Sequence, residues 1–438
     1  MGSRVLSLPY GRGMMEFTIG EENVLRIIDG GNFSAALDEE EEIKKALSNP
    51  INSKPMREML KKGMRVVIIA SDITRVAKND VVVPLIIDEL NQIGIPDEDI
   101  TVITATGTHR KHEEKELKML FGRAYGKVDI IDHDAKDEED LVYIGKTKRG
   151  TEVYINKRVF NADFIILTGA ISYHFMAGFS GGRKSICPGV SGYKTIQMNH
   201  KLMLNSDEEK GGINPNVGHG RLKDNPIAED MDEICDKIKP DFLVNVILDD
   251  RGNLLKVVCG DYKEAFLEGC SFATSFFSVS LPAKADALIL SCGGFPKDID
   301  FYQATKAIEN WLKAVRDGGY IVLTAECPDG IGHEGFYEII TRYRTRKERE
   351  RVLREEFTIA RAVGYILTLG LEKTKILLVS SMDEDLVREM GLIPIKDLNN
   401  AINYLKDNFK PDFKSYIVPH ASTIVPFLEN DEEIFPGK

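Results

Sequence analysis

The segment Leu167–His200, with the sequence LTGAISYHFMAGFSGGRKSICPGVSGYKTIQMNH, contains the strongest signals for both fold and function in this chain. It opens with the end of an apolar run, residues 162–170 (ADFIILTGA), which has the length and composition of a strand buried in a parallel sheet. A glycine-rich loop with Lys184 follows, and the residues after CPGVSG indicate the start of a helix. His174 and His200 lie on the two sides of that loop. The segment therefore predicts a strand, a loop with reactive side chains and a helix in direct succession.

Comparable apolar runs alternate with helical patterns over the remainder of the chain. Examples are RVVIIA (65–70), DITVITAT (99–106), ADALILSCGG (285–294) and YIVLTAEC (320–327). This alternation predicts an α/β protein made of two α/β domains with mainly parallel sheets. The N-terminal domain is expected at residues 1–280 and the C-terminal, doubly wound domain at residues 281–414, with the active site in the cleft between them. The C-terminal tail, residues 415–438, is a candidate to return to the first domain.

Local patterns predict several individual elements. Residues 4–20 (RVLSLPYGRGMMEFTIG) indicate a hairpin around the YGRG turn, and a second hairpin is expected around Arg149–Gly150. Asp80 is a suitable N-cap for a helix over residues 81–93. Residues 346–369 indicate one long helix.

Composition argues against several classes of protein. A formal net charge of −12 argues against a protein that coats nucleic acid, because such a protein needs a basic face. No apolar run is long enough to predict a membrane span. The six cysteines are scattered without a CxxC pair, a pattern typical of free thiols in a reducing compartment. We therefore expect a cytoplasmic protein without nucleic-acid or membrane partners.

Chemically active residues follow three of the predicted strands. Asp72 and Arg75 come after RVVIIA, His109 comes after DITVITAT, and His174 comes after ADFIILTGA. Ligand sites of open α/β sheets lie outside the carboxyl ends of the strands, so these residues are predicted to meet in one crevice. The fork of an arginine binds carboxylate or phosphate at two points. Histidine serves both as an acid–base group near neutral pH and as a metal ligand.

The glycine-rich loop GFSGGRKS (178–185) admits more than one interpretation. It resembles the phosphate-binding pattern G-x-x-x-x-G-K-[ST], but Arg183 stands where that pattern requires a glycine before Lys184. A glycine-rich turn can also hold an anion through its backbone N–H groups, or it can be a turn that simply needs positive φ. Because Lys184 is enclosed by glycines and lies between two histidines in the sequence, it is a candidate covalent anchor.

A further cluster lies in the C-terminal half of the chain. FYQATKAIEN places Tyr302, Gln303 and Lys306 at the start of a predicted helix, just after the Gly293–Gly294 turn. Gln303 and Lys306 are three residues apart and therefore share one face of that helix. A helix start with a cation nearby suits the binding of an anion.

Taken together, these motifs resemble the nickel-dependent lactate racemase family, whose members are racemases and epimerases of 2-hydroxyacids that use a nickel-pincer nucleotide. The matching stretches are SDITR (71–75), TGTHR (106–110), SYHFMAGFSGGRKSICPG (172–189) with its trailing MNH (198–200), and GGFPKDIDFYQATK (293–306). They span both predicted domains, and their order along the chain also matches the family. The set of His174, Lys184 and His200 is the most specific part of the resemblance.

The resemblance implies a role for each of these residues. Lys184 forms the thioamide link to the cofactor, Ni(II) pyridinium-3-thioamide-5-thiocarboxylic acid mononucleotide, and His200 is the protein ligand of nickel beside two sulfurs and one carbon of the pincer. His109 and His174 act as acid and base on the two sides of the substrate. Hydride meanwhile passes reversibly from the substrate C2 to the cofactor through a 2-keto acid. Further cofactor contacts map onto Asp72 and Arg75, and substrate contacts map onto Arg75, Tyr302, Gln303 and Lys306.

The same resemblance implies a small 2-hydroxyacid or a sugar acid as substrate, and separate enzymes that make the cofactor. The chain departs from the family in TRVAKND (74–80), where a proline is expected soon after the TR pair, so the substrate is predicted only as a class. Two other functions stay open from the residues themselves. One is a phosphate- or nucleotide-binding enzyme that uses the GFSGGRKS loop, and the other is a carrier that binds nickel or the cofactor without catalysis.

Overall fold

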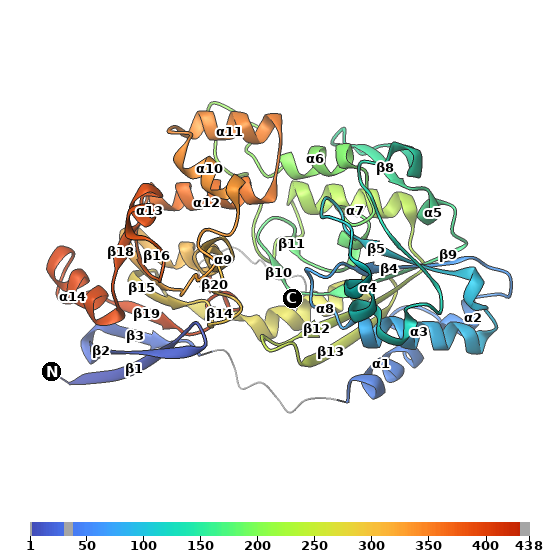
Figure 1. Cartoon of the computed structure of the whole chain (residues 1–438), viewed down its shortest axis with the longest axis horizontal. Coiled ribbons are helices and arrows are strands. Elements are labelled where there is room, and N and C mark those ends of the chain that lie inside the picture. Colours follow the sequence, from blue (N-terminus) through green and yellow to red (C-terminus); the bar gives the residue numbers. More distant parts are fainter. Residues whose placement is uncertain (1, 30–37, 430–438) are drawn as a thin grey trace. The chain divides into compact units, whose positions relative to one another are not determined.

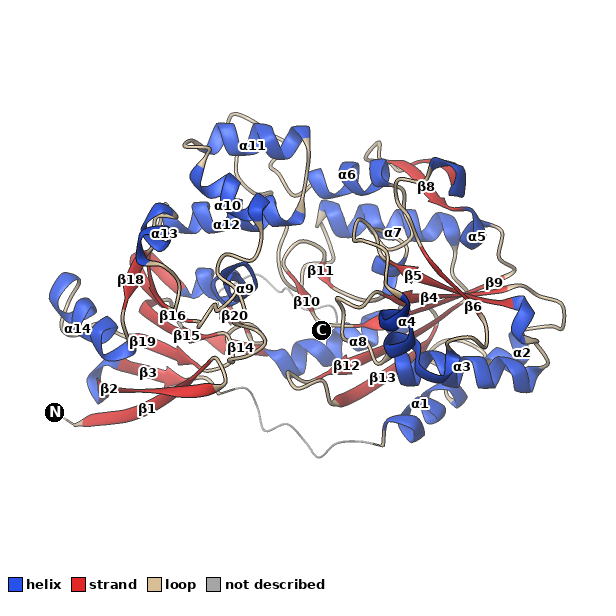
Figure 2. Cartoon of the chain, viewed as in Figure 1, coloured by secondary structure: helices blue, strands red, loops and turns tan. Residues whose placement is uncertain are grey.

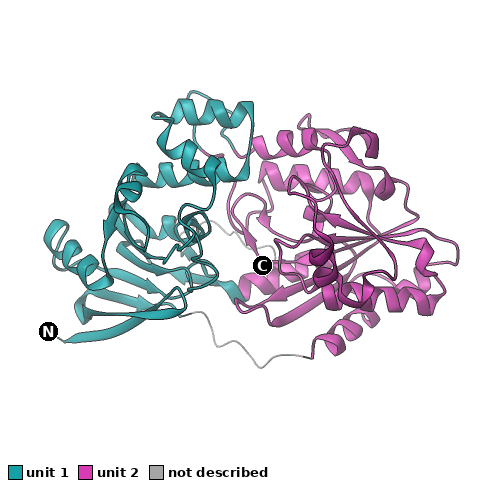
Figure 3. Ribbon diagram, in the orientation of Figure 1, with its two compact units in different colours: residues 1–32, 204–212, 276–433 teal, residues 33–203, 213–275, 434–438 magenta. Residues whose placement is uncertain are grey.

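The computed structural model describes residues 2–29 and 38–429. The chain divides into two compact units, which Figure 3 shows in different colours. Among the described residues, unit 2 comprises residues 38–203 and 213–275, and unit 1 comprises residues 2–29, 204–212 and 276–429. Each unit combines helices and strands (Figure 2), and the predicted α/β class with mainly parallel sheets is confirmed.

Unit 2 is built on a sheet whose central strands are the apolar runs of the sequence. Its strands are β4 (Val66–Ser71), β5 (Ile100–Ala105), β6 (Asp129–Asp132), β9 (Phe164–Ala170), β12 (Phe242–Leu248) and β13 (Leu254–Gly260). Among the described residues their order is β13-β12-β9-β4-β5-β6. The strands pair in parallel except for the antiparallel edge pair β12–β13. Side chains on both faces of β4 and β9 are buried, as continuous apolar runs predict.

Helices cover both faces of this sheet (Figure 1). On one face, α1 (Glu39–Ser48) and α3 (Asn79–Ile93) share a hydrophobic core with β4, β5, β9 and β12. On the other face, the short 3-10 helix η5 (Gly182–Ser185) lies on β9, and α7 (Pro226–Ile238) and α8 (Glu264–Phe277) pack against it. The remaining elements of unit 2 are α2 (Met56–Met59), α4 (Glu114–Phe121), β7 (Leu141–Lys146), β8 (Glu152–Asn156), α5 (Lys157–Phe160), β10 (Tyr173–His174), β11 (Gly178–Phe179) and α6 (Tyr193–Lys201).

Unit 1 contains a second sheet in which all neighbouring strands are parallel. Its strands are β3 (Val24–Ile27), β15 (Ala285–Ser291), β16 (Val315–Thr324), β17 (Lys375–Val379), β18 (Ile393–Ile395) and β19 (Ser415–Val418). Their order in the described part of the chain is β18-β17-β16-β15-β19-β3. The helices of this unit are α9 (Phe301–Trp311), α10 (Glu334–Thr341), α11 (Arg346–Glu355), α12 (Ile359–Leu371), α13 (Glu384–Glu389) and α14 (Leu398–Asn408).

Smaller strands complete unit 1. The predicted N-terminal hairpin is confirmed as β1 (Ser3–Tyr10) and β2 (Gly13–Gly20), and its Leu8, Phe17 and Ile19 join α14 in the core on one face of the sheet. β14 (Ser278–Leu281) pairs in parallel with β20 (Val425–Leu428).

The second predicted hairpin is confirmed as β7 and β8 of unit 2. No helix among the described residues is both long enough and apolar enough to cross a membrane.

The division of the chain differs from the predicted boundaries at both ends. Residues 2–29, which the prediction placed in the N-terminal domain, belong to unit 1, because β3 pairs with β19 and the hairpin packs on the same sheet. The described part of the C-terminal tail, residues 415–429, also stays in unit 1, where β19 pairs with β15 and β20 pairs with β14. Residues 430–438 of that tail lie outside the described residues.

Two helix predictions are wrong in detail. The helix after β4 begins at Asn79 with Lys78 as its N-cap residue, so Asp80 lies in its first turn and does not cap it. The predicted long helix is two helices, α11 and α12, because the chain leaves the helical path after Glu355 and buries Phe357. A new helix then starts at Ile359, capped by Thr358, whose side chain accepts a hydrogen bond from the backbone N–H of Arg361.

Candidate active site

The candidate site of unit 2 lies at the carboxyl ends of β9, β4 and β5, which are neighbours in the sheet. Asp72 and Arg75 follow β4, His109 follows β5 and His174 follows β9. The residues that were predicted to share one crevice therefore follow three adjacent strands of the sheet.

Asp72 and His109 form a hydrogen-bonded pair across the β4 and β5 loops. The Asp72 side chain is 3 % exposed, and its Oδ2 contacts Nδ1 of His109, whose own side chain is 42 % exposed. Asp72 Oδ1 accepts hydrogen bonds from Thr74, at 3.1 Å from the backbone nitrogen and 2.7 Å from Oγ1. Burial by itself raises the pKa of Asp72, but the hydrogen bonds from His109 and Thr74 outweigh burial and lower it. Asp72 is therefore an ionised carboxylate that fixes the Nδ1 side of His109.

The glycine-rich loop turns sharply over the end of β9. Gly181 and Gly182 have φ of +74° and +51°, which favour glycine. A Cβ on Gly182 would lie 2.5 Å from the Phe266 ring, and the backbone N–H of this glycine donates to Asn245 Oδ1 of β12 at 2.8 Å. Ser185 Oγ donates to the Thr168 carbonyl of β9 at 2.9 Å. The glycines thus let the loop pack closely on the sheet and hold the intervening Lys184 in a defined place.

Lys184 and His174 meet within this loop, with Nζ 3.2 Å from Nε2 of the imidazole. The other imidazole nitrogen, Nδ1, accepts hydrogen bonds from the backbone N–H groups of Met176 and Ala177, both at 3.2 Å. A nitrogen that accepts carries no proton, so neutral His174 has its proton on Nε2 and donates it toward Lys184. Lys184 can accept that hydrogen bond only as a neutral amine. Burial, followed by the charges of Arg75 and Arg183, lowers the pKa of Lys184 to about 7, in agreement with this geometry.

His200 lies on α6 and is 4 % exposed. Burial, followed by the charge of Lys184, lowers its pKa to about 3, so its imidazole is neutral and able to bind a metal. The described residues contain no group of three or more His, Cys, Asp or Glu side chains that could hold a metal ion. His200 can offer one imidazole ligand to a metal.

The guanidinium groups of Arg75 and Arg183 make this region electropositive. Burial, then Lys184, Arg75, His200 and finally His219, lowers the pKa of His174 well below its ordinary value. Such an accumulation of positive charge favours an anion such as a carboxylate. The adjacent Arg183 is 3 % exposed and is engaged by the Ala177 carbonyl at 2.9 Å and by Asp232 at 2.9 Å. Arg183 is thus a structural residue. It stands at the position that a glycine occupies in the phosphate-loop pattern, and its side chain is used for contacts within the protein.

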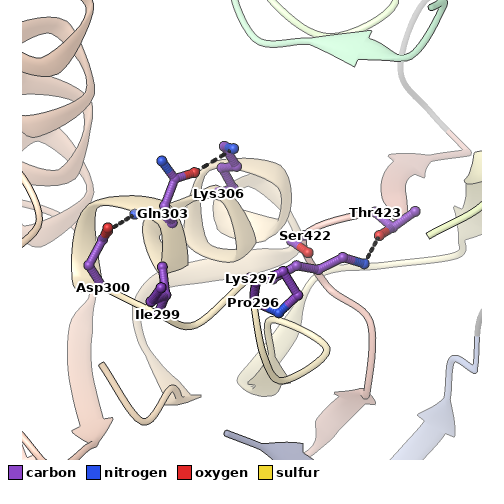
Figure 4. A pocket seen from close by; sticks show the side chains of 8 residues that line it. All are labelled: Pro296, Lys297, Ile299, Asp300, Gln303, Lys306, Ser422 and Thr423. Carbon is purple, nitrogen blue, oxygen red and sulfur yellow. Dashed lines mark hydrogen bonds between the residues drawn. The ribbon is translucent and has the colours of Figure 1, made fainter. Parts of the chain in front are cut away.

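Gln303 and Lys306 line a pocket of about 390 Å³ that lies within unit 1 (Figure 4). Asp300 Oδ1 caps helix α9 by accepting from the Gln303 backbone N–H at 2.7 Å, and Lys306 Nζ donates to Gln303 Oε1 at 2.7 Å. A second lysine, Lys297, donates to Thr423 Oγ1 at 3.0 Å on the same pocket wall. Two lysines against one aspartate give the pocket a positive character suited to an anion.

Tyr302 occupies a different environment from its two neighbours. Its ring centroid is 5.6 Å from the His333 ring and 5.7 Å from the Phe336 ring. It is not among the residues that line the pocket of Gln303 and Lys306.

Sequence reasoning missed several residues that shape the site. Asn245 anchors the glycine-rich loop from the neighbouring strand, and Lys297 lines the pocket of unit 1. His112, which was assigned no role, is almost completely buried and bonds to the β4 loop and to Asp132. The signal for His112 was its place three residues after His109, at the same strand end.

The family models identify the chain directly. The lactate racemase N-terminal domain matches residues 10–212, and the lactate racemase C-terminal domain matches residues 281–425. The chain belongs to the lactate racemase family. The lactate racemase of Thermoanaerobacterium thermosaccharolyticum is 31 % identical over 96 % of this chain and 98 % of its own length. The lactate racemase of Lactiplantibacillus plantarum is 32 % identical over 91 % of this chain and 93 % of its own length.

Solved structures agree with the family assignment. The lactate racemase apoprotein from T. thermosaccharolyticum superposes with a TM-score of 0.87 at 30 % identity, covering 97 % of this chain and 100 % of that one. A protein from Thermotoga maritima superposes with a TM-score of 0.62 at 18 % identity, covering 90 % of this chain and 100 % of its own, and shares the fold.

Proposed function

We propose that this member of the lactate racemase family is an isomerase that racemises or epimerises a 2-hydroxyacid with a covalently bound nickel-pincer nucleotide. The observation that supports this proposal most strongly is the half-buried Lys184–His174 pair, with Nζ and Nε2 3.2 Å apart, beside Arg75 and His200. A phosphate loop would direct its lysine toward a phosphate as a cation, whereas Lys184 is arranged as a neutral amine. Family membership and this geometry support the same assignment.

The residues of unit 2 suit the proposed cofactor. Desolvation lowers the pKa of Lys184 to about 7, so near neutral pH a large share of it is the neutral amine, which is the nucleophilic form required for an amide-type link. His200 is a buried neutral imidazole, and a nickel held mainly by sulfur and carbon of an organic group would take it as the remaining ligand. When bound, the group would accept hydride from the substrate C2 and return it. Asp72 and Arg75 would help to seat its nucleotide part.

His109 and His174 are proposed as the acid–base pair, and their surroundings place them in complementary proton states. Asp72 accepts at Nδ1 of His109, so Nδ1 carries the proton and Nε2 has the lone pair of a base. Backbone N–H groups donate to Nδ1 of His174, so its Nε2 carries a proton and can act as an acid. A racemase needs both functions, because the substrate hydroxyl loses its proton in one direction and regains it in the other.

Three charged or polar side chains are proposed as substrate contacts. They are the guanidinium of Arg75 in unit 2 and, in the pocket of unit 1, the amide of Gln303 and the ammonium group of Lys306. Tyr302 is retained in this proposal as a further substrate contact from α9. The substrate class is 2-hydroxyacids, sugar acids included, and the cofactor is made by separate enzymes.

Intact-mass and metal analysis of the chain, co-produced with the cofactor-making enzymes, tests this proposal. An added mass that maps to Lys184, together with about one nickel per chain, is the expected result, and both should be absent from Lys184→Ala. A panel of single enantiomers of 2-hydroxyacids then identifies the substrate by loss of optical purity. An unmodified, metal-free chain under these conditions would refute the proposal. Nickel binding without any exchange of configuration would instead establish a carrier.

A further inference from the structure

A second imidazole, His112, lies beneath the Asp72–His109 pair and belongs to the same loop as His109. Its side chain is 2 % exposed, so its ring nitrogens depend on hydrogen bonds within the protein. Its Nε2 accepts a hydrogen bond from the backbone N–H of Ile73 at 3.0 Å. Ile73 directly follows Asp72, so the two imidazoles bind consecutive residues of the β4 loop, one through the carboxylate and one through the backbone.

Asp132, the last residue of β6, sets the orientation of His112. Its Oδ1 lies 2.6 Å from Nδ1 of the imidazole, and its Oδ2 accepts the backbone N–H of His112 at 2.7 Å. The Asp132 side chain is 9 % exposed and also receives the hydroxyl of Thr104 on β5. Both carboxylate oxygens are therefore engaged, and ring and backbone of His112 are bound by one side chain.

These contacts fix the tautomer of His112. Nε2 faces a donor, the Ile73 N–H, and therefore carries no proton, whereas Nδ1 faces a carboxylate and therefore carries one. A ring with its proton on Nε2 would direct one N–H group at another. The hydrogen bond to Ile73 would then be lost, and with it the fixed path of the backbone that leads from β4 through Asp72 to Thr74.

We infer that His112, oriented by Asp132, is a positioning residue that holds the β4 loop so that Asp72 meets His109. The inference rests on the proposed function in so far as His109 is one of its acid–base residues. Asp72 is 3 % exposed, and its carboxylate accepts hydrogen bonds from the backbone and side chain of Thr74 and from His109, so its place depends on the course of the β4 loop. A backbone displacement of about 1 Å at such a site costs on the order of 100-fold in rate.

Nitrogen NMR of the full-length 15N-labelled chain tests the tautomer directly. The expected result is an unprotonated, pyridine-type signal for Nε2 of His112, a protonated signal for Nδ1, and a through-hydrogen-bond coupling between Nε2 and the Ile73 amide nitrogen. A proton on Nε2 would overturn the inference. This measurement does not require the cofactor.

Two substitutions of His112 separate positioning from general stabilisation. His112→Gln places an amide oxygen where Nε2 was, so it can still accept from Ile73, whereas His112→Phe fills the space without an acceptor. In His112→Phe, the carboxyl 13C titration of Asp72 should shift upward by about one pH unit, because Asp72 loses aligned donors, and His112→Gln should stay close to wild type. The matched control is His133→Phe, since His133 is also buried in unit 2 and contacts the Ser191 carbonyl at 3.0 Å instead of the β4 loop.

Kinetics of the loaded protein complete the test. His112→Phe should lower kcat on the order of 100-fold with little change in KM, and His112→Gln should recover most of that loss. The inference would be refuted if His112→Phe and His112→Gln had the same kcat, or if His112→Phe left the titration of Asp72 unchanged. Neither result would contradict the racemase proposal. If the wild-type chain racemises nothing, the Asp72 titration and the tautomer of His112 still decide the inference.

Discussion

Nζ of Lys184 lies 3.2 Å from Nε2 of His174, whose other nitrogen is occupied by two backbone N–H groups. The backbone of one short turn thereby favours the neutral form of a lysine. His174 donates, and Lys184 accepts as a neutral amine, which is its nucleophilic form.

Selective modification of Lys184 should follow from this arrangement. Reductive methylation of the cofactor-free chain at limiting reagent should label Lys184 with an apparent pKa of about 7, because burial disfavours its charged form. The measurement is peptide mass spectrometry as a function of pH, with Lys115, which is 80 % exposed, as the internal reference. A Lys184 that titrates together with Lys115 would contradict the neutral amine.

Replacing Lys184 with an apolar residue should stabilise the protein at pH 7. The unfolded lysine has a pKa of about 10.4 and the folded one about 7, so between these values the unfolded state binds more protons and stability rises with pH. Lys184→Met removes this effect and should gain a few kcal/mol relative to wild type at pH 7, with a difference that shrinks toward pH 10. Thermal unfolding across that range is the measurement. A difference independent of pH would mean that only packing had changed.

His200 should make wild type sensitive to mild acid. Its folded pKa of about 3 is below the unfolded value of about 6.5, so the unfolded state binds the extra proton in this window. The contribution of this histidine to stability is present above pH 6.5 and is lost progressively as the pH falls toward 3. His200→Gln should therefore show a flatter decline of melting temperature between those pH values than wild type. An unaltered slope would count against a buried neutral His200.

His109→Asn should separate catalysis from cofactor attachment. The variant lacks the proposed base but leaves Lys184 and His200 in place, so racemisation should fall by about 100-fold or more while the Lys184 adduct and nickel remain. The measurements are the rate of racemisation and, on the same preparation, the intact mass and the nickel content. Asp88→Asn is a suitable control, because Asp88 is a surface partner of Arg123 at 2.6 Å and should leave both quantities unchanged.

Lys306→Ala should weaken substrate binding without loss of the cofactor. The proposed carboxylate loses a charged partner, for which an increase in KM of roughly tenfold or more is expected. Nickel content and the Lys184 adduct should match wild type. Lys347→Ala on the exposed side of α11 is the comparison, and an equal effect of both substitutions would remove Lys306 from the substrate site.

The sequence predicted those parts of the molecule that local patterns specify. Buried strands such as β4 and β9 were visible as apolar runs, and the strand-end rule selected Asp72, His109 and His174 from neighbouring strands. The pairing of β3 with β19 was not predictable in this way, because their residues are separated by about 390 positions and β3 is only four residues long. The break between α11 and α12 was missed because helical periodicity continues through Phe357, and the cap at Thr358 is a short local signal.

The site was predicted better in residue type than in arrangement. That Lys184 is neutral depends on where the N–H groups of Met176 and Ala177 point, which no sequence pattern reports. The role of His112 depends in the same way on a backbone donor at Ile73. Contacts between a side chain and a distant backbone group follow from the folded path of the chain, so a reading of residue types does not find them.

Because β19 lies between β15 and β3, β3 cannot join its sheet until β19 has been synthesised. Residues 24–27 are synthesised long before their partner strand, residues 415–418. All strands of the unit 2 sheet are made in between, within residues 66–260, so that unit can fold while β3 still lacks its partner strand and has an exposed edge. A chain that terminates before residue 415 would thus retain a folded unit 2 and an open β3 edge, a combination prone to aggregation.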